Sequence, residues 1–194
     1  MKRIIISVEG QSEQEFVKTI LAPYLINKGI FDIRAIPIKK TNGGLVRYSH
    51  LKRDVMAYVN ENNVLVTSFI DYFRIPSCFP GYVAAQHYKT ADEKIACMEE
   101  AFAKDIGFYN FIPYIQKYEF ESLLFSSDGG FKKHCDGDQW AKTKKIIDAY
   151  ENPEDINNSP ETSPSNRLKA IIPGYNKILL GTLIGMEIGI TSIL

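Results

Sequence analysis

A short apolar run near the start of the chain, Ile4–Val8, ends at Glu9 and Gly10 and leads directly into a helical pattern. An apolar run of this length, bounded by a turn, is typical of a buried strand. Ser12 and Glu15 have the spacing of a capping box, which predicts the start of the helix here. In open α/β sheets the carboxyl ends of the strands carry the chemistry, so Glu9 is predicted to lie at a functional edge. Gly10 allows the backbone to turn tightly at that point.

Three further apolar runs predict strands, and helical patterns separate them. The predicted strands cover residues 31–38, 64–70 and 111–116. The helical patterns cover residues 16–25, 51–59 and 90–106. Thr90 and Glu93 form a second predicted capping box. This alternation predicts an α/β fold in three layers, with a mostly parallel central sheet of about four strands and helices on both faces.

The pattern changes beyond Ser126, where turns and helical segments replace the strands. We therefore divide the chain into an α/β core, residues 1–127, and a helical C-terminal extension, residues 128–194, packed on the same domain. The apolar tail, residues 178–194, contains Gly181, Gly185 and Gly189 at i, i+4 spacing, a pattern also found in membrane helix pairs. It contains Glu187 and is shorter than the ~20 apolar residues of a span, so no membrane segment is expected.

The composition is that of an ordinary globular protein. The 194 residues are 45% hydrophobic and carry a formal net charge of +0, with an isoelectric point of about 6.8. No global basic field attracts nucleic acid, so a polyanion would need a local patch or a metal ion. The cysteines, Cys78, Cys97 and Cys135, are odd in number and widely spaced, which favours reduced thiols in the cytoplasm. The apolar run at the start is too short for a signal peptide.

Acidic side chains follow three of the predicted strands: Glu9, Asp71, and the pair Glu119 and Glu121. Because the carboxyl ends of parallel strands meet at one edge of a sheet, these carboxylates could bind Mg²⁺ or Mn²⁺, which prefer oxygen ligands. Two alternatives remain for them. Asp71 could cap a turn, and one of Glu119 and Glu121 is expected on a solvated helix surface, since helical residues two apart point to different sides.

Four segments together resemble a bacterial family of unknown function that is described as Toprim-related. The order and spacing of the segments carry the resemblance, which extends over most of the chain. The segments are VEGQSE at 8–13, FIDYF at 69–73, FIPYIQKYEFESLLF at 111–125 and INNSPETSPSNR at 156–167. The family is similar to the Toprim modules of overcoming-lysogenization-type nucleases, topoisomerases and primases, and this similarity implies a Toprim-like fold.

The resemblance also implies roles for individual residues. Glu9 would be the catalytic acid/base group and Asp71 a ligand to magnesium or manganese. The second aspartate of the Toprim pattern is Phe73 here. We therefore expect Glu121 or Glu119 to supply the missing ligand, with Glu9 completing the metal site.

The function that this resemblance implies is a metal-dependent nuclease or phosphodiester-transfer protein acting on nucleic acid, in phage defence or a restriction-associated locus. Basic side chains are candidates for phosphate contacts, although each could equally be a solvated surface charge. The candidates are Lys39, Lys40, Arg47 and Arg167. Arg167 is favoured because Ser163 and Pro164 predict a helix start, where anions bind.

The alternative function is a catalytically degenerate Toprim-like binding or regulatory module of a partner ATPase. The chain has no GxxxxGK[ST] phosphate loop, so the ATPase would be a separately encoded protein. Members of the resembling family continue into a further segment, so we expect the sequence to be a truncated form. DNA and RNA both remain open as substrates, and so does the oligomeric state.

Overall fold

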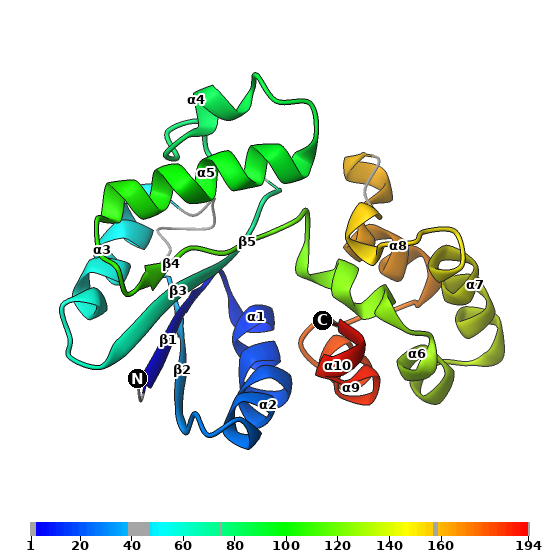
Figure 1. Ribbon diagram of the computed structural model, residues 1–194. Coiled ribbons are helices and arrows are strands. Elements are labelled where there is room, and N and C mark those ends of the chain that lie inside the picture. Colours follow the sequence, from blue (N-terminus) through cyan, green and yellow to red (C-terminus); the bar gives the residue numbers. More distant parts are fainter. Residues whose placement is uncertain (1–2, 39–46, 74, 157–158, 194) are drawn as a thin grey trace. The chain divides into compact units, whose positions relative to one another are not determined.

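The computed structural model describes residues 3–38, 47–73, 75–156 and 159–193 (Figure 1). These residues form two compact units. The first, which we call the sheet unit, comprises the described parts of Met1–Gln14 and Leu25–Lys117. The second, which we call the helical unit, comprises Glu15–Tyr24 and the described part of Tyr118–Leu194. Lys39 and Lys40, two predicted phosphate contacts, lie outside the described residues.

The sheet unit is built on a parallel sheet. Its strands are β1 (Arg3–Val8), β2 (Asp32–Pro37), β3 (Val64–Asp71), β4 (Phe111–Ile112) and β5 (Ile115–Gln116). The strand order is β2-β1-β3-β4, and β5 also pairs with β3. Every described strand pair is parallel. The predicted α/β class with a mostly parallel sheet is therefore confirmed.

The central strand β1 is buried on both faces, as its continuous apolar sequence predicts. Ile4, Ile5 and Ile6 are all buried, although successive side chains of a strand point to opposite faces. β1 pairs with β3 in a register that places Val8 opposite Phe69. The carboxyl ends of these two strands therefore reach the same edge of the sheet together.

The fourth predicted strand forms as two short strands, β4 and β5, because Pro113 between them has no backbone N–H to donate. Ser68 of β3 bridges the interruption with its side chain. Its Oγ donates to the carbonyl of Tyr114 and accepts the Tyr114 N–H, both at 3.0 Å. The two short strands thereby stay in line along β3.

The sheet unit contains the helices α3 (Tyr48–Val59), α4 (Tyr82–Ala85) and α5 (Ala91–Ile106) (Figure 1). The helices α1 (Gln11–Phe16) and α2 (Ala22–Asn27) follow β1 in the chain, and each has residues in both units. A π-helical turn, η1 (Val17–Leu21), connects α1 to α2, and the boundary between the two units crosses this continuous helical segment twice. α3 and α5 bury one face of the sheet, where Phe102 meets Phe111 edge-on at 4.7 Å between ring centroids. On the other side, Gln14 Nε2 of α1 donates to the Ala35 carbonyl of β2 at 3.0 Å.

The start of α1 differs from the prediction by two residues. The helix begins at Gln11, and the carboxylate that closes its first turn belongs to Glu13, which accepts the Gly10 N–H at 2.8 Å. Ser12 lies inside the helix, and Glu15 forms an ion pair with Lys18 instead. The predicted Ser12–Glu15 capping box is therefore wrong. The second predicted box, Thr90–Glu93 at the start of α5, is confirmed.

The helical unit consists of short helices. Its elements beyond residue 117 are η2 (Phe120–Ser126), α6 (Gly129–His134), α7 (Gly137–Ile147), η3 (Pro153–Asp155), η4 (Pro160–Thr162), α8 (Pro164–Ile171), α9 (Leu180–Ile188) and α10 (Ile190–Ile193). α6 and α9 approach closely, because a Cβ added at Gly130 would lie 2.5 Å from the carbonyl oxygen of Ile184.

The glycines of the apolar tail have a packing role in the helical unit. A Cβ added at Gly185 would lie 2.7 Å from Ile20, and one added at Gly181 would lie 2.9 Å from the Tyr175 hydroxyl. Within the described residues, no helix combines the length and the apolar character that a membrane span requires. Gly181 and Gly185 thus allow close contacts inside this unit, whereas a Cβ added at Gly189 would meet nothing within 4 Å.

Candidate functional site

Glu9 and Asp71 lie together at the carboxyl edge of the sheet. Glu9 directly follows β1, and Asp71 is the last residue of the neighbouring strand β3. The Glu9 N–H continues the strand pairing by donating to the Phe69 carbonyl at 3.2 Å. The Asp71 N–H then donates to Glu9 Oε2 at 3.3 Å. The parallel register therefore brings these two predicted site residues into direct contact.

The turn after Glu9 contains an acidic residue to which the sequence analysis gave no role. Glu13 is buried, and its Oε2 fixes the turn by accepting the Gly10 N–H. The Gly10 carbonyl in turn accepts the Gln14 N–H at 3.2 Å, which starts the helix. The spacing of Gly10 and Glu13, which is that of an N-cap residue and the third residue of a helix, is the signal that could have pointed to it.

Two buried hydroxyl groups stand on either side of the Glu9–Gly10 turn in the sequence. Ser7, on β1, and Ser12, in α1, are both buried, and neither Oγ has a hydrogen-bond partner among the described residues. Nearly all buried polar atoms in folded proteins are hydrogen-bonded. The fold of the sheet unit therefore does not by itself account for hydroxyls at these two positions.

A lysine that the sequence analysis missed lies beside this edge. Gln116 of β5 pairs with Asp71, and its carbonyl accepts the Tyr72 N–H at 2.8 Å. The next residue, Lys117, has a side chain that is only 11% exposed, and its Nζ lies 2.9 Å from the carboxylate of Asp92. The strand pairing thus adds one cation to the carboxyl edge, at a position that no local pattern marks.

Glu119 and Glu121 belong to the helical unit. Glu119 Oε2 accepts the Ser165 N–H at 3.0 Å, so this carboxylate caps the start of α8. Glu121 is 3% exposed. One of Glu119 and Glu121 was expected on an exposed helix surface, and neither of them is exposed. The pKa of Tyr175 is raised above its ordinary value, mainly by burial of its side chain and further by the negative charges of Glu121 and Glu119. The three groups therefore interact within the helical unit.

A family model matches residues 8–194, which is nearly the whole chain. The chain belongs to the DUF4276 family. The family is described as a domain of unknown function. No curated protein matches the chain. Among solved structures, the C-terminal region of the OLD protein of Xanthomonas campestris pv. campestris is similar to this DUF4276 chain, with 13% identity and a TM-score of 0.38 over 96% of this chain and 92% of that one.

The four carboxylates of the predicted metal site are divided between the two units of the DUF4276 chain. Glu9 and Asp71 lie in the sheet unit, and Glu119 and Glu121 lie in the helical unit. Among the described residues, no group of three or more His, Cys, Asp and Glu is arranged to hold a metal ion. A metal site built from all four carboxylates stays a prediction.

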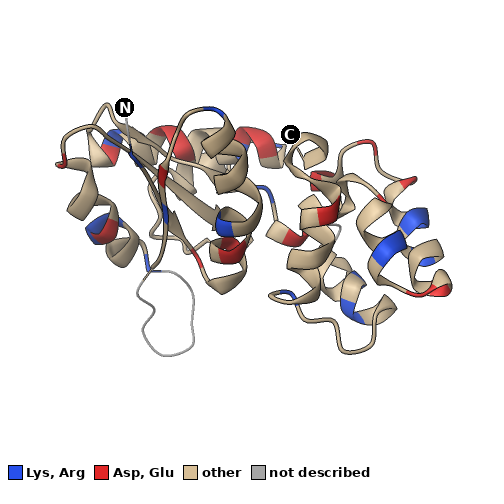
Figure 2. Cartoon of the chain, turned by 90° about the horizontal axis from the view of Figure 1, so that it is seen from below, with Lys and Arg blue, Asp and Glu red and all other residues tan. Residues whose placement is uncertain are grey.

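Two of the four predicted phosphate contacts lie within the described part of the DUF4276 chain. Arg47 is exposed directly before α3. Arg167, in α8, donates from Nε to the Thr162 carbonyl at 2.6 Å and from Nη2 to the Tyr150 hydroxyl at 3.3 Å. Basic and acidic segments occur in both units (Figure 2). Arg167 therefore has a structural role in the helical unit, whether or not it also meets a phosphate.

Proposed function

We propose that this chain is a Toprim-like, metal-dependent nuclease or phosphodiester-transfer protein that acts on nucleic acid in the cytoplasm, in phage defence or a restriction-associated locus. The observation that carries the proposal is the meeting of Glu9 and Asp71 on neighbouring parallel strands, with Glu9 Oε2 3.3 Å from the Asp71 nitrogen. These two residues have the roles of acid/base and metal ligand in the Toprim pattern that the sequence resembles. The free thiols of Cys78, Cys97 and Cys135 support the cytoplasmic location.

The residues at this edge fit a magnesium or manganese ion. Glu9 and Asp71 offer carboxylate oxygens on rigid strands, and proteins commonly bind Mg²⁺ through one or two carboxylates together with water and substrate phosphates. When bound, the ion would stabilise the negative charge that develops on the phosphoryl oxygens.

The side chains of the chain then have distinct tasks. Glu9 transfers a proton at the phosphodiester, and its position is fixed because its backbone continues the pairing of β1 with β3. Asp71 holds the metal from the adjacent strand. Phosphate contacts from Arg47 and Arg167, and from Lys39 and Lys40, supply affinity that does not depend on sequence and that weakens with salt.

The test is a cleavage assay with the full chain. Plasmid, single-stranded DNA and tRNA are incubated with the protein in Mg²⁺ or Mn²⁺. We expect Glu9→Gln and Asp71→Asn each to lower the cleavage rate by at least ~100-fold, the usual range for general acid–base and metal contributions. The matched control is Glu15→Gln, which removes a carboxylate from the helix that follows Glu9; among the described residues its ion pair is with Lys18, at the surface. Equal cleavage by wild type and Glu9→Gln in every condition would contradict the proposal.

One observation favours a second function. Phe73 stands where the Toprim pattern has its second aspartate, so the chain could be a degenerate module that binds nucleic acid or regulates a separately encoded ATPase. This alternative predicts that Glu9→Gln leaves binding and activation of the partner intact. Loss of partner activation in a Glu9→Gln protein that keeps its fold would exclude it.

A further inference from the structure

The strand β2 lies at one side of the sheet, and none of the described strands pairs with its outer side. None of its six residues is buried, whereas five of the six residues of β1 are buried. A strand in this position presents backbone N–H and C=O groups to which a further strand can add. The outer side of β2 is therefore a candidate interaction surface.

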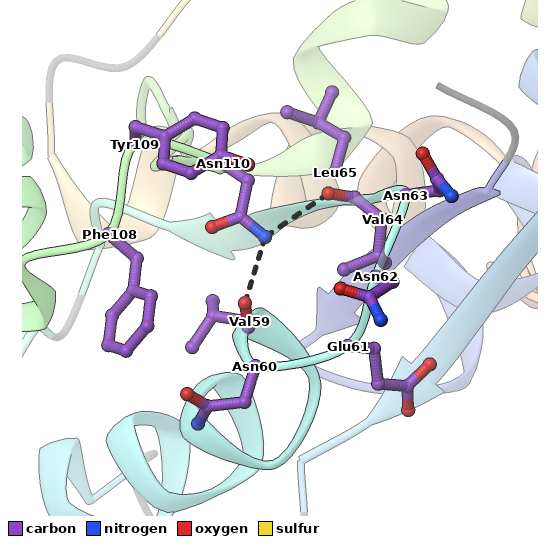
Figure 3. Close-up of a pocket in the computed structure, with 10 residues that line it drawn as sticks. All are labelled: Val59, Asn60, Glu61, Asn62, Asn63, Val64, Leu65, Phe108, Tyr109 and Asn110. Atoms are coloured by element: carbon purple, nitrogen blue, oxygen red, sulfur yellow. Dashed lines mark hydrogen bonds between the residues drawn. The ribbon is translucent and has the colours of Figure 1, made fainter.

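The opposite side of the sheet carries features that prevent such pairing. β4 and β5 have two residues each, and Pro113 interrupts the line between them. Asn110, directly before β4, donates to the carbonyls of Val59 at 2.9 Å and Val64 at 3.2 Å (Figure 3). Short strands and proline are common protection for the edge of a sheet. In β2, the proline is at the last position, Pro37.

The register of β2 with β1 determines which backbone groups point outward. The Ile38 N–H donates to the Val8 carbonyl of β1 at 3.0 Å. Because alternate residues of a strand point to the same neighbour, the even-numbered residues of β2 face β1, and Ile33 and Ala35 face outward. Gln14 Nε2 of α1 donates to this outward Ala35 carbonyl at 3.0 Å. A carbonyl oxygen has two lone pairs, so a second donor can still bind there.

The charges of β2 select one symmetric way to pair it with a second copy of the chain. An antiparallel register centred on Asp32 or on Arg34 would place like charges opposite each other, which destabilises a sheet. The register centred on Ile33 instead places Asp32 opposite Arg34 of the second copy, and Arg34 opposite its Asp32. The sequence of β2 is therefore complementary to itself in this register.

The ion pairs within one chain are compatible with this arrangement. Arg3 Nε lies 2.7 Å from Asp32 Oδ2 and holds that carboxylate at the amino edge of the sheet, where the strands begin. Arg34 Nε lies 2.9 Å from Asp32 Oδ1, and the Arg34 side chain is 56% exposed. An exposed ion pair contributes little to stability, so its exchange for a pair across two strands costs little.

The opposite face of the paired strands would be apolar. Phe31 directly precedes β2 and is 75% exposed. Its side chain shares a face with Ile33 and Ala35, because side chains alternate along an extended chain. In the register centred on Ile33, Phe31 lies opposite Ala35 of the second copy, and the two Ile33 side chains meet. Pairing would therefore remove exposed apolar surface from water.

We infer that two copies of this chain associate through β2, antiparallel and centred on Ile33, and form one continuous sheet. Backbone hydrogen bonds join Ile33 to Ile33, and Phe31 to Ala35, across the two-fold axis. The contact is isologous, since each chain presents the same surface to the other. The association does not depend on nuclease activity.

The first test uses the unmodified full chain. Its mass by light scattering should rise toward twice the 22.0 kDa of one chain as the concentration increases through the micromolar range. Over the same range, hydrogen exchange should slow more at the outward amides of Ile33 and Ala35 than at those of Arg34 and Ile36, which face β1. The mass of a single chain at every concentration would overturn the inference. A dimer without this difference in exchange would also overturn it.

Charge reversal tests the register. Arg34→Glu places acidic side chains opposite each other, and Asp32→Lys places basic ones, so each variant alone should raise the dimer dissociation constant at least ~10-fold. An equimolar mixture of the two variants restores both opposite-charge pairs. We expect the mixture to form a heterodimer at least ~10-fold tighter than the dimer of either variant.

The matched control is Arg53→Glu, which makes the same charge change at an exposed position of α3 and should dimerise like wild type. If Arg53→Glu and Arg34→Glu weaken the dimer equally, net charge explains the effect and the pairing of β2 is wrong. Failure of the mixture to associate more tightly than its components would contradict the register.

A backbone variant tests the pairing without a change of charge. Ala35→Pro removes an N–H that points outward and keeps the hydrogen bonds between β2 and β1, and proline is tolerated in edge strands. The variant should retain the circular dichroism of wild type and lose the dimer. A folded Ala35→Pro protein that dimerises as tightly as wild type would exclude association through β2.

Discussion

The two edges of the sheet carry charge in opposite ways. At the amino edge, Arg3 on β1 pairs with Asp32 on β2 at 2.7 Å and with Glu61, just before β3, at 2.6 Å. At the carboxyl edge, two acidic residues, Glu9 and Asp71, stand at the ends of the neighbouring strands β1 and β3, and the backbone N–H of Asp71 donates to Glu9 Oε2. Opposite charges across strands stabilise a sheet. The ion pairs of the amino edge therefore serve the fold, whereas the acids of the carboxyl edge are the residues to which the proposed function assigns chemistry.

The largest effect on stability is expected at the amino edge. Asn110→Ala removes the two hydrogen bonds that tie the end of α3 to the start of β3 and leaves two carbonyl groups without that donor. We expect a loss of about 2 kcal/mol in the free energy of unfolding, measured by urea denaturation. Asn62→Ala, at an exposed position of the turn between α3 and β3, should change it by less than ~0.5 kcal/mol. Equal effects would show that Asn110 does not fix this edge.

A smaller effect is expected from the ion pairs of the amino edge, and it depends on pH. Hydrogen bonds from Arg34 and then Arg3 lower the pKa of Asp32 below its ordinary value. A carboxyl group with a lowered pKa in the folded protein stabilises it above the ordinary value, and this contribution is lost as the pH falls through the folded pKa. Wild type should therefore be more stable than Asp32→Asn at pH 6, and the difference should begin to shrink only below about pH 4, the ordinary pKa of an aspartate, and vanish below the lowered pKa of the folded protein.

The control for this pH dependence is Glu100→Gln, an exposed carboxylate on α5 for which the described residues show no ion pair. Its difference from wild type should stay near zero from pH 6 to pH 3. If Asp32→Asn and Glu100→Gln give the same pH profile, the strand-bridging ion pairs do not distinguish the amino edge.

The smallest effect on stability is expected at the carboxyl edge. Glu9→Gln keeps an oxygen that can accept the Asp71 N–H, and both Glu9→Gln and Asp71→Asn keep the size and shape of the side chain. We expect each to change the free energy of unfolding by less than ~0.5 kcal/mol. A loss of 2 kcal/mol or more in urea denaturation would mean that these acids are structural, and the contrast between the edges would fail.

Local patterns in the sequence predicted the parts of the fold that local interactions determine. The apolar run at Val64–Asp71 forms β3, and the Thr90–Glu93 box starts α5. The start of α1 was predicted wrongly because two pairs of residues there have the capping-box spacing of three: Gly10 with Glu13, and Ser12 with Glu15. The structure selects Glu13, whose carboxylate reaches back to Gly10.

The features that the sequence could not predict depend on contacts between residues that are far apart in the chain. The meeting of Glu9 with Asp71 depends on the register of β1 with β3, although the sequence did predict that both lie at strand ends. Asn110 shows no local pattern, since its partners, Val59 and Val64, lie 46 or more residues away.

The central claim is that Glu9 and Asp71 bind one divalent metal ion together. The most direct measurement is Mn²⁺ binding to the full chain, followed by electron paramagnetic resonance of the free ion. Wild type should bind one Mn²⁺, Glu9→Gln and Asp71→Asn should each weaken binding at least ~10-fold, and Glu15→Gln should bind like wild type. Identical Mn²⁺ binding by all four proteins would contradict the claim.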